Sequence, residues 1–262
     1  MKRIKAVFLD IDGTLIDGAT GPFPDDIALI EAVHEAGHKV FLATGRSLAA
    51  LPPVLKNARW VDGVIAGCGA TVSLYGNIIY RKFVAPELLP EISGLYLKNG
   101  KWCVFEGETG IFALGSYLIF DYGEPVYMIG DPGDFRRKYS GEIITKVTME
   151  GFLTSEERAV FEPALRVIEF AAYSEAIVAA ESKLRGMDRV LAALGLNRDS
   201  AVAIGDSEND IDIVKAAGLG IAMGNSRDAL KAAAKAHTGD VGRGGVADAL
   251  KKYVLNDAET EP

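Results

Sequence analysis

The sequence has few of the residues that form cross-links or bind metals through sulfur and nitrogen. Its 262 residues include only two cysteines, Cys68 and Cys103, and no CxxC pair. This excludes a disulfide framework and a cysteine-rich zinc site. The three histidines, His34, His38 and His237, are scattered along the chain, which argues against a histidine metal site or a Ser-His-Asp triad.

Long hydrophobic runs and an excess of basic residues are also lacking. No apolar stretch approaches the roughly 20 residues of a membrane span, and the run after the basic start, Ala6–Leu9, is too short for a signal peptide. Acidic residues outnumber basic ones 36 to 28, and the one tight basic cluster is Arg136–Lys138. We therefore expect a soluble, cytoplasmic protein with no nucleic-acid or membrane partner. The sequence predicts no oligomeric state.

What the chain does contain is a series of short apolar runs that end in small or acidic residues. Five such runs are expected to be strands: Ala6–Asp10, Lys39–Thr44, Gly63–Ala66, Ala201–Ile204 and Gly220–Met223. Their continuous hydrophobicity is typical of parallel strands buried on both faces. Helical patterns from Pro24 to Gly37 and from Met187 to Gly195 separate them. The alternation predicts the α/β class, with a Rossmann-like parallel sheet.

The middle of the chain has a different composition. Residues 82–179 hold 15 of the 22 aromatic residues, and their 9 basic and 15 acidic residues give most of the net charge of -8. Strand-like runs such as Tyr117–Phe120 alternate there with helix-like segments such as Glu156–Ile168. The shift predicts an inserted α+β domain at 82–179, with residues 1–81 and 180–262 forming the core.

Carboxylates and hydroxyls follow three of the expected strands. Asp10 and Asp12 follow the first and Thr44-Gly45 ends the second, while Asp206 and Asp210 follow the fourth. Ligands of α/β sheets bind at such carboxyl ends of strands. Acidic groups gathered there would repel one another, and a hard divalent cation such as Mg²⁺ relieves that cost. Lys183 is a candidate positive group for the substrate, although a lone lysine is usually a surface residue.

Four motifs occur in order: DIDGTL at 10–15, TGR at 44–46, SK at 182–183 and GDSEND at 205–210. Together they resemble the signatures of the haloacid dehalogenase-like hydrolase superfamily. The insertion resembles the type-two cap of its Cof-like, subclass IIB phosphatases. The resemblance implies an aspartyl-phosphate mechanism with Mg²⁺ as cofactor and a small phosphorylated metabolite as substrate. It also implies that the cap gates access and sets specificity.

The resemblance also implies a role for each motif residue. Asp10 would be the nucleophile and Asp12 the general acid and base. The metal would be held by Asp10, Asp206 and the Asp12 carbonyl oxygen, with Asp210 orienting a bound water or Lys183. Phosphoryl oxygens would be bound by four residues: Thr44, Gly45, Lys183 and Asn209.

Three positions depart from the family pattern. Cys68 stands where Cof-like proteins usually carry asparagine, as a buried small residue or as a thiol facing the substrate. Lys183-Leu184 replaces the usual Lys-Gly, and Arg185-Gly186 offers a rival register that leaves the following helix two residues short. Ile213 replaces a methionine, which is a conservative change in a core.

Two further functions remain open. A phosphosugar mutase can share the second aspartate and the cap type. A phospho-accepting receiver module also carries acidic residues with a threonine and a lysine, but it needs only ~120 residues. Asp12 and the 98-residue insertion favour the phosphatase over the receiver. The net charge of -6 in the insertion argues against a leaving group with further negative charge.

Overall fold

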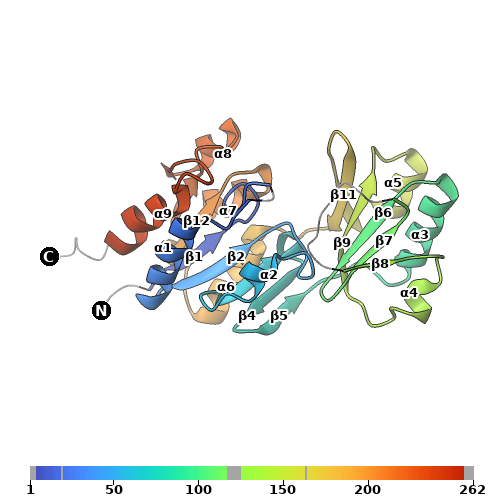
Figure 1. Cartoon of the computed structure of the whole chain (residues 1–262), viewed down its shortest axis with the longest axis horizontal. Helices are drawn as coiled ribbons and strands as arrows, with labels where there is room; N and C mark the ends of the chain where they lie inside the picture. Colours follow the sequence, from blue (N-terminus) through green and yellow to red (C-terminus); the bar gives the residue numbers. More distant parts are fainter. Residues whose placement is uncertain (1–3, 19, 117–124, 163, 257–262) are drawn as a thin grey trace. The chain divides into compact units, whose positions relative to one another are not determined.

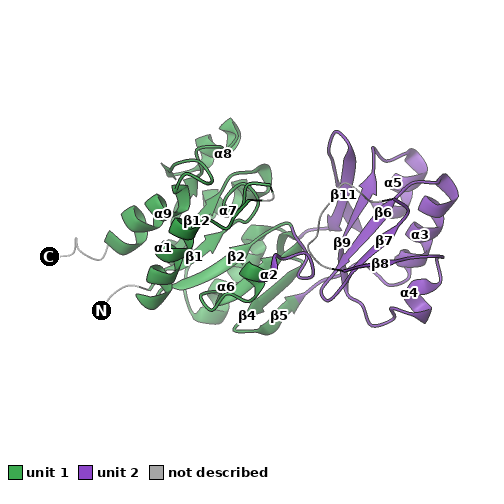
Figure 2. Ribbon diagram, viewed as in Figure 1, with its two compact units in different colours: residues 1–45, 54–80, 182–262 green, residues 46–53, 81–181 purple. Residues whose placement is uncertain are grey.

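The computed structural model describes residues 4–18, 20–116, 125–162 and 164–256, and the chain divides into two compact units (Figure 2). Unit 1 comprises Met1–Gly45, Val54–Tyr80 and Ser182–Pro262, and unit 2 comprises Arg46–Pro53 and Arg81–Glu181. The expected Tyr117–Phe120 strand lies outside the described residues. No helix in the described ranges is long and apolar enough to cross a membrane.

Unit 1 is built on an eight-stranded sheet in the order β14-β13-β12-β1-β2-β3-β4-β5. Its strands are β1 Ala6–Leu9, β2 Lys39–Ala43, β3 Gly63–Ala66, β4 Thr71–Leu74, β5 Asn77–Arg81, β12 Ala201–Gly205, β13 Leu219–Ala222 and β14 Ala236–His237. The pairings from β14 to β3 are parallel, and β4 pairs antiparallel with β3. The five predicted strands end within one residue of those observed, so the parallel α/β core is confirmed.

Helices cover both faces of this sheet (Figure 1). They are α1 Pro24–Glu35, α2 Pro53–Lys56, α6 Lys183–Leu194, α7 Ile211–Ala216, α8 Asp228–Ala233 and α9 Gly245–Leu250. On one face, Phe8 of β1 and Phe41 of β2 pack in a cluster with Met187 of α6 and Val214 of α7. On the other, α1 packs against α9. Because both faces of its central strands are covered, β1, β2, β3 and β12 are almost wholly buried and apolar, and polar residues follow where these strands end.

Unit 2 contains a six-stranded sheet in the order β10-β11-β9-β6-β7-β8. Its elements are α3 Leu88–Asn99, β6 Cys103–Gly107, β7 Ile111–Leu114, β8 Val126–Met128, α4 Asp134–Arg137, β9 Ile144–Glu150, α5 Ser155–Phe161, β10 Leu165–Glu169 and β11 Tyr173–Val178. All of its strand pairs are antiparallel except β7 with β8. α3 contacts α4, α5 and β7.

The structure corrects one sequence-based expectation and divides the chain slightly differently from the expected domains. The helix expected at Glu156–Ile168 ends at Phe161, and Leu165–Glu169 is strand β10, because Pro163 disfavours helix before it and the alternating pattern that follows suits a strand. Residues 46–53, assigned to the core, group with unit 2, because Ala49 and Ala50 pack against Val104 of its sheet. The structural division between the units falls at Tyr80/Arg81 and Glu181/Ser182.

One buried carboxylate connects helices α1 and α9 of unit 1. Asp26 of α1 is fully buried, and its Oδ1 accepts a hydrogen bond from the backbone N–H of Ala247 in the first turn of α9, at 2.8 Å. Its Oδ2 has no partner among the described residues. Burial raises the pKa of Asp26 above its usual value, so the charged form is disfavoured in the folded state.

We expect Asp26→Ala to lower the free energy of unfolding by about 1–3 kcal/mol, because it leaves the buried N–H of Ala247 without an acceptor. Asp26→Asn keeps an acceptor and removes the charge. Since the folded-state pKa of Asp26 is raised, the wild type loses stability relative to Asp26→Asn as pH rises from about 4 through that pKa. Urea unfolding of the three proteins between pH 4 and 8 measures this. Equal stability of Asp26→Ala and wild type would contradict the capping role.

Candidate active site

The loop after β1 brings the first motif to the end of the sheet. The Asp10 backbone N–H donates to the Ile204 carbonyl of β12, so the residue continues the strand pairing, and its side chain is 4% exposed. The chain then turns tightly, with the N–H groups of Leu15 and Ile16 both donating to the Ile11 carbonyl. Asp10 is therefore fixed by the backbone at a defined place.

Gly13 in this loop cannot carry a side chain, because another residue lies very close to its backbone. Its φ is +83°, and a Cβ added there would collide with the carboxylate of Asp206. The Asp206 side chain thus lies directly against the backbone of the β1 loop. The glycine directly after Asp12 leaves the space that this carboxylate occupies.

Asp210 organises the loop after β12. Its Oδ2 accepts hydrogen bonds from the N–H groups of Asp206, at 3.3 Å, and Ser207, at 3.1 Å. Its Oδ1 accepts from Lys183 Nζ at 2.7 Å. Because Asp210 begins the turn into α7, the short segment from 206 to 210 places both aspartates at one strand end.

Lys183 joins the two loops. It is the first residue of α6, its side chain is 1% exposed, and its Nζ lies 2.6 Å from Asp10 Oδ1 and 2.7 Å from Asp210 Oδ1. Burial alone would lower the pKa of Lys183, but the two carboxylates outweigh it and raise that pKa above its usual value. The lysine is therefore a buried ammonium and not a surface residue.

The carboxylates of Asp10, Asp206 and Asp210 have ligand oxygens within 4.8 Å of one another. Burial and the neighbouring Asp210 raise the pKa of Asp10 well above its ordinary value, with Lys183 opposing, and raise that of Asp206 to about 6. Asp206 Oδ1 is buried without a hydrogen-bond partner among the described residues. One ammonium does not balance three carboxylates. The all-oxygen donor set and the unpartnered oxygen fit a divalent cation such as Mg²⁺.

The end of β2 lies beside this cluster. Thr44 is fully buried, its N–H donates to the Ile65 carbonyl, and its own carbonyl accepts from the Cys68 N–H. A Cβ added to Gly45 would lie 3.5 Å from Asn209 Nδ2 and 3.6 Å from Cys68 Sγ. The predicted residues Thr44, Gly45 and Asn209 are thus neighbours, and the buried Cys68 adjoins them.

Asp12 and Asn225 are two further residues of this part of unit 1. Asp12 is exposed, and its carboxylate is not in the group formed by Asp10, Asp206 and Asp210. Asn225, which had no predicted role, donates through Nδ2 to the Gly13 carbonyl at 2.8 Å, and that atom lies 3.5 Å from Asp206 Oδ2. Its position just after β13, at the same edge of the sheet, is the signal that identifies it.

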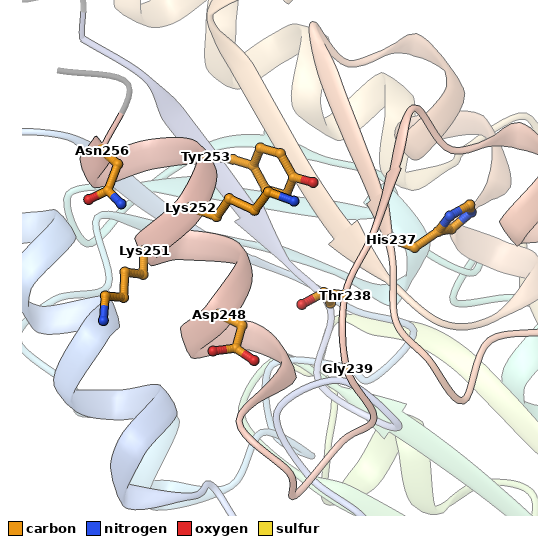
Figure 3. Close-up of a pocket in the computed structure, with 8 residues that line it drawn as sticks. All are labelled: His237, Thr238, Gly239, Asp248, Lys251, Lys252, Tyr253 and Asn256. Carbon is orange, nitrogen blue, oxygen red and sulfur yellow. The ribbon is translucent and has the colours of Figure 1, made fainter. Parts of the chain in front are cut away.

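A separate cavity of about 400 Å³ is lined by His237, Thr238, Gly239, Asp248, Lys251, Lys252, Tyr253 and Asn256. Its charged side chains diverge: the Lys251 ammonium points away from that of Lys252, which lies over the Tyr253 ring (Figure 3). His237 Nε2 is 2.9 Å from the Lys231 carbonyl. The cavity contains none of the predicted site residues, and its cations do not converge on one point.

Comparisons with known proteins agree with this geometry. The family model for haloacid dehalogenase-like hydrolases matches residues 7–250. The chain is 25% identical to phosphoglycolate phosphatase 1 of Saccharolobus solfataricus, with 97% of each chain covered. It is 26% identical to the 5-amino-6-(5-phospho-D-ribitylamino)uracil phosphatase YcsE of Bacillus subtilis, with 96% of each covered.

The fold is also similar to that of the subclass IIB sugar phosphatase BT4131. The TM-score is 0.78 at 26% identity, over 95% of this chain and 98% of that one. The chain therefore belongs to the haloacid dehalogenase-like hydrolases, within their Cof-like subclass IIB, and is a phosphatase.

Proposed function

We propose that this protein is a Mg²⁺-dependent phosphatase that hydrolyses small phosphomonoesters, such as sugar phosphates, through a phosphorylated Asp10. The observation that carries the proposal is the meeting of Asp10, Asp206 and Asp210 around the buried Lys183 ammonium. The small phosphorylated substrates named for the two curated relatives support the substrate class.

The metal would be held by the side chains of Asp10 and Asp206 and by the Asp12 carbonyl oxygen. When bound, Mg²⁺ offsets the negative charge of the carboxylates and of the phosphoryl oxygens. Asp210 would act on the site through Lys183 and the 206–207 backbone, which it already holds by hydrogen bonds.

In the first step, an Asp10 carboxylate oxygen attacks phosphorus, and the bond from phosphorus to the ester oxygen breaks. Asp12 gives its proton to the leaving alkoxide, which departs as an alcohol. In the second step, Asp12 takes a proton from water as the water oxygen attacks phosphorus. The bond to Asp10 breaks, inorganic phosphate leaves, and Asp12 is protonated again. The exposure of Asp12 leaves its carboxylate accessible to both the alcohol and the water.

Lys183, Thr44, the Gly45 amide and Asn209 would bind the phosphoryl oxygens. Donors that are already in place stabilise developing charge without reorganising, and removing one such donor typically costs about 10²–10³-fold in rate. Unit 2 would act as the cap domain of the phosphatase. We place the protein in the cytoplasm, as its composition indicates.

The test is hydrolysis of p-nitrophenyl phosphate by the purified protein. We expect activity with Mg²⁺, a loss of at least about 100-fold after EDTA treatment, and recovery when Mg²⁺ is restored. Phosphorus NMR with sugar phosphates distinguishes the mutase, which yields an isomeric phosphate instead of free phosphate. A stable phosphorylated protein without turnover would indicate a receiver. Full activity in EDTA would contradict the metal assignment.

A further inference from the structure

Asn225 belongs to unit 1, and the proposed mechanism gives it no role. It lies in the turn after β13, and this turn is fastened to the end of β12. The Met223 N–H donates to the Gly205 carbonyl at 3.0 Å, and the Ser226 hydroxyl donates to the same carbonyl at 3.3 Å. Because Gly205 directly precedes Asp206, the turn holds Asn225 beside a carboxylate of the candidate site.

The side-chain amide of Asn225 joins three loops. Its Nδ2 donates to the Gly13 carbonyl at 2.8 Å and lies 3.5 Å from Asp206 Oδ2. Its Oδ1 accepts a hydrogen bond from the Val241 N–H at 2.9 Å. A carbonyl can only accept and an N–H can only donate, so these two partners fix which way the amide points. The donor end of Asn225 therefore faces the β1 loop and Asp206.

The loop that contains Val241 supports this amide from the other side. The Gly224 N–H donates to the Gly239 carbonyl at 2.9 Å, and a Cβ added to Gly224 would collide with the Asp240 side chain. The Asn225 side chain itself is exposed, so its hydrogen bonds replace bonds to water and contribute little to stability. What these contacts determine is the direction of the donor, and not the strength of the fold.

The two carboxylate oxygens of Asp206 have different surroundings. Oδ2 is the atom nearest to the place where a Cβ of Gly13 would lie, and Asn225 Nδ2 is beside it. Oδ1 is buried, and no group in the described part of the chain forms a hydrogen bond with it. A buried oxygen without a partner is unfavourable, and a cation would supply one. The surroundings therefore distinguish an oxygen held by the loop from an oxygen left for a ligand.

We propose that Asn225 is a positioning residue that keeps Asp206 Oδ2 at the β1 loop, so that Asp206 offers the metal one oxygen, Oδ1. This inference rests on the Mg²⁺ site of the proposed function. Mg²⁺ requires near-ideal octahedral geometry, whereas the larger Ca²⁺ readily takes both oxygens of one carboxylate. A carboxylate restricted to one oxygen therefore favours Mg²⁺, and Asn225 contributes to the choice between the two cations.

The experiment measures cation binding by isothermal titration calorimetry with MgCl₂ and with CaCl₂, without substrate. Asn225→Ala removes the donor to Asp206 and frees both carboxylate oxygens. We expect the ratio of the Kd for Mg²⁺ to the Kd for Ca²⁺ to rise about tenfold, a typical cost of removing a group that orients a metal ligand. Asn225→Asp keeps the acceptor for Val241 but loses the donor, so its ratio should rise in the same way. Its added negative charge attracts both cations and cancels in the ratio.

Asn77→Ala is the matched control. Asn77 begins β5 at the edge of the same sheet, and its Nδ2 donates to the Tyr75 carbonyl at 3.2 Å, so the change removes the same kind of exposed hydrogen bond. Its ratio should stay at the wild-type value. An unchanged ratio in both Asn225 variants would overturn the inference, because a merely structural role weakens the binding of both cations together. A wild type that binds neither cation and hydrolyses no phosphate ester with Mg²⁺ would contradict the proposed function itself.

Discussion

Replacing Asp10 with asparagine is expected to lower kcat for p-nitrophenyl phosphate by at least about 10⁴-fold, which corresponds to roughly 5–6 kcal/mol in the barrier. The amide has nearly the shape of the carboxylate, so the β1 loop and its hydrogen bond to Ile204 stay in place. What is lost is the only atom that forms the bond to phosphorus in the proposed mechanism, and neither Lys183 nor Asp206 replaces it.

The fold should tolerate this change. Burial and Asp210 raise the pKa of Asp10 well above its ordinary value, so the charged carboxylate is disfavoured in the folded protein. Asparagine removes that charge, and Lys183 keeps Asp210 as its partner. In EDTA at neutral pH we expect a melting temperature equal to or above that of the wild type.

The measurement combines steady-state kinetics with mass spectrometry of acid-quenched protein. The wild type should carry a phosphoryl group during turnover, and Asp10→Asn should carry none. Asp188→Asn is the control, since Asp188 is a surface aspartate of unit 1 paired with Arg198, and it should keep wild-type kcat. Activity of the Asp10 variant within tenfold of wild type would rule out Asp10 as the nucleophile.

The meeting of the site residues was predictable because each follows a strand that the sequence marks clearly. Buried parallel strands read as continuous apolar runs, so the ends at Asp10, Thr44 and Gly205 stand out. Which strands are neighbours is a property of the topology. β1 lies between β2 and β12, and this order, which no local pattern encodes, brings Asp10 and Asp206 together.

Contacts that depend on register or on backbone approach were not predictable. In unit 2, the ion pairs of Lys146 with Glu106 and Glu175 join strands β9, β6 and β11, and a shift of one residue in any of these strands would turn its side chain to the opposite face of the sheet. The contact of Gly13 with Asp206 depends on a φ of +83° that any turn glycine can adopt.

Lys183→Met is expected to have the largest effect on stability. It removes the one cation held between Asp10 and Asp210 and leaves two buried carboxylates facing each other, at a cost of about 3–5 kcal/mol at neutral pH in EDTA. Activity should fall at least about 10²-fold, since a donor to the phosphoryl group is also lost.

The lost stability should return in two ways. Mg²⁺ binds the folded carboxylates and offsets their repulsion, so the deficit shrinks when the metal is added. Protonation of a carboxylate removes its negative charge and so also reduces the repulsion. The folded-state pKa of Asp10 is already raised, and loss of Lys183 raises it further, so the stability deficit shrinks as pH falls through that pKa and is full above it.

Urea unfolding between pH 5 and 8, with EDTA or Mg²⁺, measures both effects. Lys101→Met is the control, because its ammonium pairs with the single carboxylate of Glu157 within unit 2, and its deficit should not respond to Mg²⁺. If the stability deficit of Lys183→Met changed with neither Mg²⁺ nor pH, the electrostatic account would be contradicted. Adding Asp210→Asn to Lys183→Met should restore part of the stability, because Asp10 then faces only Asp206. Activity should stay low, because the phosphoryl donor is still missing.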